Sequence, residues 1–568
     1  MEFEYGMNLE ELKMRTSKQC YKGIKLLSPT SPQIKSLSKN ELEVLKHLAK
    51  AASYFDSVCF KLDNHHNQEF LTFLEMEEKK GDERAKLAKK MFLSQKSMFS
   101  PDALGNQTSL VKNLKQSDGL GFYPEDLSSK EFIHILNEML DNGENEKVGK
   151  ILNQRSIVVR DGKWLKAIDY VDAFSEFKEI AKNLRLAEKA CEDKSFCDFL
   201  IKQAKALETA DEKLDSLADK AWAKLDENCK FEFTVTRECY GDKLTGAVLE
   251  NKKLMSRLKK AGIQVYAKDA LGARVGIVNK RGTALLKKLK GLIGVAAKNM
   301  PFKDEYESLA EESSSEGQIA VDVDLVSLTG DEGAYRASVV LAQNLPNDDK
   351  LSVQTGGGRR NVYHRQIRAN ANKKLFKNLI TESQFKYFNP HASHLATICH
   401  ENTHSLGPES GSKLGAYSSI IEEFKADMGM YAFLDEFKKA GYFSEDDCKE
   451  IIVTELASSF CKGKPSLSEA HRTRSVMIVN RMIKEKAIKF DITGKLEFDY
   501  EKVKKTARRM LAEVIRLQID GDTLGAKAYI DKWFEWTGEL EHIAEIIKKF
   551  SKKLNGYLIM PFADELLK

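Results

Sequence analysis

The stretch "CHENTHSLGPES", Cys399 to Ser410, decides how this chain is interpreted. It holds two histidines four positions apart with a glutamate directly after the first, a pattern that also arises by chance. The neighbouring residues favour a helix, because the Asn-Pro pair at positions 389 and 390 is typical of a helix start and the Gly-Pro pair at 407 and 408 of a helix end. We therefore predict one helix over residues 391–406.

Residues four apart share one face of a helix, so His400 and His404 can bind the same metal ion. Glu401 lies at the edge of that face, where it can take a proton from a water molecule beside the metal. A catalytic zinc site needs three protein ligands and one open position. The segment "YSSIIEEFKADMGMYAFLDEF" supplies the third: Glu423 lies 19 positions after His404, and Asp427 follows one helical turn later.

These residues predict one zinc ion per chain, bound by two histidines and a glutamate. Asp427 is expected to orient a ligand histidine from behind, and Glu422 also belongs to this supporting layer. Ser419 followed three positions later by Glu422 is, in addition, the sequence pattern of a capping box. The chemistry that fits is hydrolysis of an amide, in which zinc polarises the carbonyl and Glu401 carries a proton from water to the leaving amine.

Composition narrows the class of protein. A chain of 568 residues, 42% of them hydrophobic, is long enough for two or three globular domains. Lys plus Arg (90) and Asp plus Glu (85) nearly balance, so charge predicts no nucleic-acid partner and no membrane surface. Nine scattered cysteines, an acidic N-terminus without a signal-peptide pattern, and no apolar run of about 20 residues predict a cytoplasmic protein without a membrane span.

The pattern of hydrophobic and β-branched residues changes twice along the chain. Residues 1–225 show helical periodicity, as in "ELEVLKHLAKAASYF", with a loop expected at "LGNQTSL". Residues 226–358 hold short β-branched runs such as "FEFTVTRE", "ARVGIVN" and "QIAVDVDLVSL", which predict a sheet. Residues 359–568 return to helical periodicity and contain the zinc residues. The expected fold class is α+β, predominantly helical.

Several segments resemble one family of peptidases. The "EEFKAD" of residues 422–427 resembles the Glu-Glu-Cys-Arg-Ala-Glu motif of dipeptidyl peptidase III. Three further segments resemble that family and follow its order along the chain: "ECYGDKLTG" (238–246), "QNLPNDD" (343–349) and "EAHRTRSVMIVNRMI" (469–483). The resemblance covers about residues 37–487. It implies two lobes around a wide cleft, a helical zinc lobe and a lobe with a small β-barrel-like sheet.

The resemblance also implies roles for particular residues. Glu238 would hold the free amino group of an oligopeptide substrate, and Asn344 and Asn347 would bind the same end of the peptide. Tyr240 would hydrogen-bond the tetrahedral oxyanion, and His471 would stabilise the transition state near the zinc. Taken alone, the asparagines are also ordinary turn residues, the tyrosine an aromatic at a sheet edge and the histidine a helix-surface residue. The implied activity is release of dipeptides from the N-terminus of oligopeptides.

The chain departs from the family pattern in ways that affect substrate fit. The family motif is His-Glu-x-x-Gly-His, whereas this chain has five residues, and only eighteen residues separate His404 from Glu423. An extra segment, "AVLENKKLMSRLKKAGIQVYA", also interrupts the middle region. A zinc endopeptidase, or another hydrolase on the same scaffold, therefore stays open. So does a non-catalytic zinc-containing binding protein, although a purely structural site would not need Glu401 and would have a fourth protein ligand.

Overall fold

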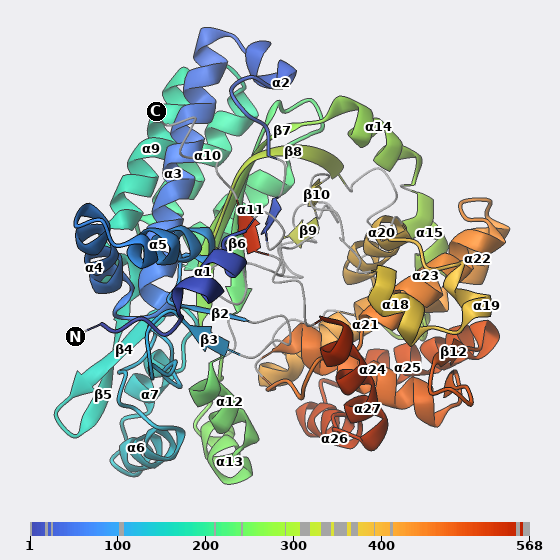
Figure 1. Ribbon diagram of the computed structural model, residues 1–568. Coiled ribbons are helices and arrows are strands. Elements are labelled where there is room, and N and C mark those ends of the chain that lie inside the picture. Colours follow the sequence, from blue (N-terminus) through green and yellow to red (C-terminus); the bar gives the residue numbers. More distant parts are fainter. Residues whose placement is uncertain are drawn as a thin grey trace.

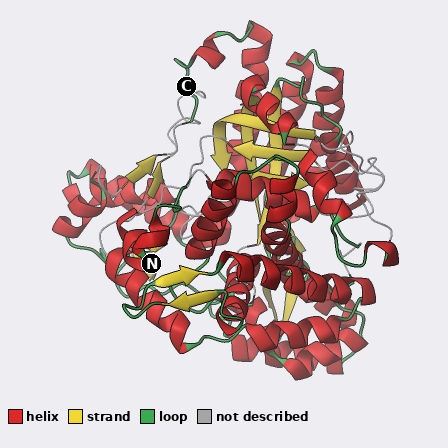
Figure 2. Ribbon diagram, turned by 90° about the vertical axis from the view of Figure 1, so that its right-hand side faces the viewer, coloured by secondary structure: helices red, strands yellow, loops and turns green. Residues whose placement is uncertain are grey.

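The structure is a computed structural model that shows a mostly helical α+β protein. It describes residues 3–17, 21–23, 26–101, 107–209, 212–239, 242–289, 291–306, 319–330, 342–345, 360–364, 373–390, 392–408, 413–467, 469–551 and 557–559. Figure 1 shows the N-terminal helices and most of the strands in one half of the view, and the C-terminal helices with β12 (Leu496–Phe498) in the other. Figure 2 shows the strands gathered between helices. Over the described residues, no helix is long and apolar enough to cross a membrane.

The N-terminal half is built around α3 (Lys39–Asp63), a helix of 25 residues. Its start is fixed by a capping box in which Ser38 accepts a hydrogen bond from the Glu41 backbone and the Glu41 carboxylate accepts one in return. The buried face of α3 packs against α9 (Glu176–Ala190) and against the central sheet. The helical periodicity that we identified in "ELEVLKHLAKAASYF" is thus confirmed.

Two hairpins interrupt this helical region, and we did not predict them. Strands β4 (Ser156–Asp161) and β5 (Trp164–Asp169) pair around a two-residue turn in which Gly162 has φ 59°. The run "SIVVRDGKW" carried the signal, namely β-branched residues followed by Asp-Gly. The predicted loop "LGNQTSL" is also partly wrong, because Gln107–Ser109 forms β3, which pairs with β2 (Phe99–Pro101).

The central sheet confirms the three strands predicted from β-branched runs. Its five strands pair in the order β6-β7-β8-β10-β9. They are β6 (Phe231–Cys239), β7 (Asp269–Val278), β8 (Ile319–Thr329), β9 (Ala342–Leu345) and β10 (Arg360–His364). β8 and β10 run parallel and the other pairs are antiparallel. Within the described residues β6 and β9 end the sheet, so the expected barrel-like closure is not seen.

The sheet is nevertheless strongly curved. Glu232 on β6 and Arg360 on β10 form a fully buried ion pair of 2.7 Å, although β7 and β8 lie between their strands in the pairing order. Trp222 donates a hydrogen bond of 2.7 Å to the same glutamate. Gly276 lies where β7 and β8 shift register, and a Cβ there would collide with Val323 of β8. Strand β10 begins at Arg360, just after residue 358, where we predicted the strand-rich region to end. The buried ion pair links β10 to β6 across the sheet.

The C-terminal helices form the other half. The predicted helix is confirmed as α20 (Ala392–His404). It packs against α21 (Ser418–Ala432) and α23 (Glu445–Ser458), and it also contacts β9. α21 in turn packs against two further helices, α24 (Ala470–Lys484) and α25 (Tyr500–Asp520). The helix that carries the predicted ligands therefore lies between the helical half and the edge of the sheet (Figure 1).

Candidate metal centre and active site

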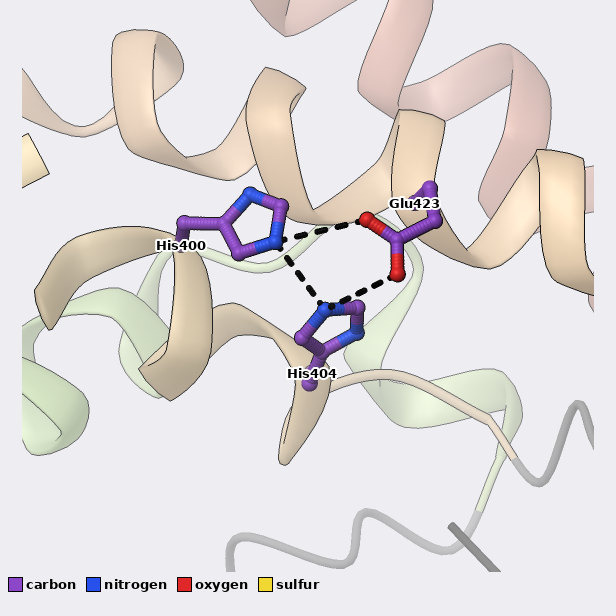
Figure 3. A group of neighbouring side chains, drawn as sticks. All are labelled: His400, His404 and Glu423. Carbon is purple, nitrogen blue, oxygen red and sulfur yellow. Dashed lines mark hydrogen bonds and ion pairs between the residues drawn. The ribbon is translucent and has the colours of Figure 1, made fainter. Parts of the chain in front are cut away.

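Two packed helices bring the predicted zinc ligands together. His400 and His404 project from α20 one turn apart, and Glu423 reaches them from α21 (Figure 3). The two histidine Nε2 atoms are 3.1 Å apart, and Glu423 lies 3.5 Å from the first and 3.8 Å from the second. The side chains are only 12–18% exposed. These residues form the one group in the described part of the chain with the make-up of a metal site.

The spacing of the candidate ligand atoms, namely the two histidine Nε2 atoms and the two carboxylate oxygens of Glu423, fits a zinc ion. Nitrogen and oxygen ligands that lie about 2.0–2.1 Å from zinc are roughly 3.3 Å from one another in a tetrahedral arrangement. The three observed distances of 3.1, 3.5 and 3.8 Å fall on both sides of that value. One carboxylate oxygen of Glu423, Oε2, is buried and faces cationic groups, with His471 Nδ1 3.0 Å away and Arg474 Nε 3.7 Å away. A cation is the partner that such an oxygen needs.

Carboxylates behind the rings select their tautomer. His400 Nδ1 lies 2.7 Å from Asp427 Oδ1, and His404 Nδ1 lies 2.9 Å from Glu422 Oε1. A carboxylate accepts hydrogen bonds, so each Nδ1 carries the proton and each Nε2 presents a lone pair. Two lone pairs that face one another across 3.1 Å repel unless a cation or a proton lies between them. The donor set thus fits zinc, with Asp427 and Glu422 as orienting partners.

The capping box predicted at Ser419 and Glu422 is not formed. Helix α21 begins one residue earlier, at Ser418, with Tyr417 as its N-cap and no side-chain cap. The Glu422 carboxylate is occupied instead by His404 Nδ1 at 2.9 Å and by Gln518 Nε2 at 3.0 Å. A charge-assisted contact to an imidazole at the metal centre replaces the local backbone contact.

Two buried cations complete the supporting layer, and the sequence analysis missed both. Lys425, 2% exposed, lies 2.8 Å from Glu422 and donates a hydrogen bond of 2.7 Å to the Leu406 carbonyl. Arg474 forms an ion pair with Asp427. The available signal was helical spacing, since Lys425 lies three positions after Glu422 and Arg474 lies three after His471. Each orienting carboxylate is therefore held by a cation of its own.

The carboxylate of Glu423, a predicted zinc ligand, has a pKa far from its usual value. Burial alone would raise its pKa, but the charge of His471, hydrogen bonds from His400 and His471, and the charge of His404 lower it well below the usual 4.5. His471, in the first turn of α24, places Nδ1 3.0 Å from Glu423 Oε2 while its side chain stays 65% exposed. The structure thus brings the predicted transition-state histidine to the edge of the cluster, on the solvent side.

Glu401, the predicted general base, is 8% exposed and lies on the same helix directly after His400. Burial raises the pKa of the Tyr363 phenol on β10 well above its usual range, and the charge of Glu401 raises it further. Burial lowers the pKa of Arg474, and the carboxylates of Glu423 and Glu401 oppose that shift. Glu401 therefore lies close enough to both the sheet and α24 to interact with them electrostatically.

The residues predicted to bind substrate are spread over strand ends. Glu238 is the last but one residue of β6, opposite Ala270. Asn344 lies in β9, opposite Asn361 of β10. These two lie on the terminal strands of the sheet, so strand pairing does not place them side by side. Two other predicted site residues lie outside the described residues: Tyr240 and Asn347.

Comparison with solved structures identifies the fold. No protein-family model matches the sequence. The structure of dipeptidyl peptidase III from Caldithrix abyssi matches with a TM-score of 0.71 and 22% identity, over 98% of this chain and 100% of that one. Dipeptidyl-peptidase III from Corallococcus sp. strain EGB matches with a TM-score of 0.73 and 19% identity, over 100% and 99%. The chain has the dipeptidyl peptidase III fold, as the motifs implied.

A plant protein is similar in sequence. Nudix hydrolase 3 of Arabidopsis thaliana is 23% identical over an alignment of 483 positions that covers 79% of this chain and 58% of the plant protein. The chain thus spans little more than half of that relative's length. The name of the plant protein describes its whole length. It does not say what the aligned region does by itself.

Proposed function

We propose that this protein is a zinc-dependent dipeptidyl peptidase that releases dipeptides from the N-terminus of oligopeptides. The observation that supports it most is the arrangement around α20, where two histidines and a glutamate converge and a further glutamate, Glu401, adjoins them. A site that only stabilises the fold needs no such neighbour, whereas hydrolysis needs a base. The dipeptidyl peptidase III fold supports peptides as the substrate class.

In this proposal each residue has a defined part. His400, His404 and Glu423 hold zinc, which when bound supplies Lewis acidity toward the carbonyl and an acidified water. Glu401 takes the proton from that water and gives it to the leaving amine. His471 and Tyr240 donate hydrogen bonds to the oxyanion as it develops.

Recognition of the free amino group would make the enzyme an exopeptidase. Glu238 would bind the substrate ammonium, and Asn344 and Asn347 would fix the first two residues so that the second peptide bond meets the metal centre. The peptide would add as a strand beside the sheet in a cleft between the two halves. The shortened loop after His404 and the extra segment at residues 247–267 are where substrate fit would differ from relatives.

The test is hydrolysis of dipeptidyl-arylamides by the purified full chain, with N-acetylated versions of the same substrates alongside. We expect cleavage of the free-amine substrates only, and one zinc per chain by metal analysis. The Glu401→Gln variant should keep its zinc and lose about 10²- to 10⁴-fold in kcat, the usual contribution of a general base.

The products and the metal content separate the alternatives. Cleavage of the acetylated substrates as well would indicate an endopeptidase. One zinc per chain without cleavage of either substrate would rule out the dipeptidyl peptidase and favour another hydrolase or a zinc-containing binding protein. Undiminished hydrolysis by Glu401→Gln would remove the proposed base.

A further inference from the structure

Arg474 has contacts that no other cation near the metal centre shares among the described residues. Its side chain is 16% exposed, and its guanidinium forms an ion pair with Asp427 Oδ2. The other oxygen of Asp427 accepts the hydrogen bond from His400 Nδ1, at 2.7 Å. Arg474 Nε also lies 3.7 Å from Oε2 of Glu423. The Arg474 guanidinium thus contacts Asp427, the hydrogen-bond partner of His400, and also lies beside the predicted ligand Glu423.

The second histidine has a simpler support. Lys425 lies 2.8 Å from Glu422, which accepts a hydrogen bond from His404 Nδ1, and it also donates a hydrogen bond of 2.7 Å to the Leu406 carbonyl. Each histidine is therefore hydrogen-bonded to a carboxylate, and each of these carboxylates is paired with a cation. Of these two cations, only Arg474 also lies beside a predicted ligand, the carboxylate of Glu423. A planar guanidinium can contact two carboxylates because it presents several donors at fixed angles, whereas an ammonium is a point charge.

Charge explains why a cation is needed at this place. Four carboxylates surround the predicted zinc position: Glu401, Glu422, Glu423 and Asp427. Zinc carries two positive charges, and Arg474 and Lys425 add one each, so the charges of these seven groups sum to zero. Without the arginine, Asp427 and Glu423 would repel one another in a poorly hydrated site, and neither would keep its orientation toward the metal or the imidazole.

We infer that Arg474 is a positioning residue of the metal centre, which holds Asp427 and Glu423 in the orientation that binds zinc and thereby sets the zinc affinity. The inference rests on the zinc site of the proposed function. Supporting residues of this kind alter metal affinity by about 10- to 100-fold when they are removed.

The experiment measures the zinc dissociation constant of the full chain by competition with a chromophoric chelator. We expect Arg474→Met to weaken zinc binding about 10- to 100-fold, and Arg474→Lys to recover part of the loss, because lysine restores the charge but not the two-sided contact. The matched control is Arg481→Met on the same helix. Arg481 is similarly buried, at 12% exposed, but pairs with Glu485 and Glu513.

Zinc affinity of Arg474→Met within twofold of the parent would overturn the inference, as would an equal loss in Arg481→Met. Should Arg474→Met fail to fold, as judged by circular dichroism, Arg474→Lys decides: affinity within twofold of the parent overturns the two-sided contact. A parent that binds zinc but cleaves no dipeptidyl-arylamide would refute the proposed function and leave the affinity comparison valid. A parent that binds no zinc would refute both.

Discussion

The metal centre and the predicted substrate-binding segments differ in how they are built. The candidate metal centre lies on helices α20, α21 and α24, of which α21 packs against the other two, and its predicted ligands are joined to orienting carboxylates and cations at hydrogen-bond distances. The substrate segments lie where strands end, with Glu238 on one terminal strand and Asn344 on the other. The packing of α21 against α20 and α24 determines which groups meet in the first region, whereas the second depends on how a curved sheet is arranged.

This difference predicts two kinds of defect. Groups that act through the metal should affect the chemical step and the metal content for every substrate. Groups that bind the peptide end should affect only substrates that have a free amino group. The following predictions test that division, beginning with the largest expected effect.

Replacing Glu423 with alanine should remove the metal and nearly all activity. Only His400 and His404 would remain as predicted ligands, too few for a stable zinc site. Metal catalysis contributes several kcal/mol, so we expect a fall in kcat/KM of at least about a thousandfold for any substrate. Metal analysis after gel filtration, together with arylamide hydrolysis, measures both. Zinc retained at one per chain would show that Glu423 is not a ligand.

The sequence predicted those parts of the fold that depend on local periodicity. Helix α20 with its two histidines and strands β6 to β8 follow from residue spacing along single elements, and Glu423 was found from its spacing after the histidine pair, on a second helix. It did not predict the pair between Glu232 and Arg360, because these residues are 128 positions apart and meet only when the sheet curves. The cations Lys425 and Arg474 were missed because a charged residue on a helix gives no indication of which helix will cover it.

The capping box failed for a related reason. The pattern at Ser419 and Glu422 satisfies a local rule, but the carboxylate finds a stronger partner in His404 across the helix interface. A tertiary contact to a charged or metal-bound group is worth more than a backbone cap. The capping rule thus fails at the candidate metal centre, where Glu422 is used to orient a predicted ligand and not to cap its own helix.

The substrate segments give the second test. Replacing Glu238 with glutamine keeps the shape but removes the charge proposed to bind the substrate ammonium. Hydrogen bonds to charged groups contribute about 1.5–3 kcal/mol, so KM for free-amine dipeptidyl substrates should rise roughly 10- to 100-fold. Zinc content should not change. A fall in kcat with KM unchanged, or a loss of zinc, would place Glu238 among the groups that act through the metal.

The smallest effect on activity is expected at Asp63 on α3, whose carboxylate contrasts with that of Glu423 in the groups that surround it. Both carboxylates are buried. Burial raises the pKa of Asp63 from 3.8 to about 6, and its hydrogen-bonding side chains, Asn67 and Ser97, are neutral. Its position as the last residue of α3 also sets its charge against the negative end of the helix dipole. The pKa of Glu423, beside three histidines, moves in the opposite direction.

The sign of the pH dependence follows from this shift. Because the folded-state pKa of Asp63 lies above the usual 3.8, its contribution to stability is fully present below pH 3.8 and is lost as the pH rises through about 6. Asp63→Asn carries no charge at any pH, so it should match the parent near pH 4 and exceed it at pH 8 by on the order of 2–3 kcal/mol. Thermal unfolding of both chains at the two pH values measures the gap, and kcat/KM should stay within about twofold. A stability difference of the same size at pH 4 and pH 8 would mean that the amide changes packing, and that burial of charge is not what distinguishes Asp63 from the carboxylates of the metal centre.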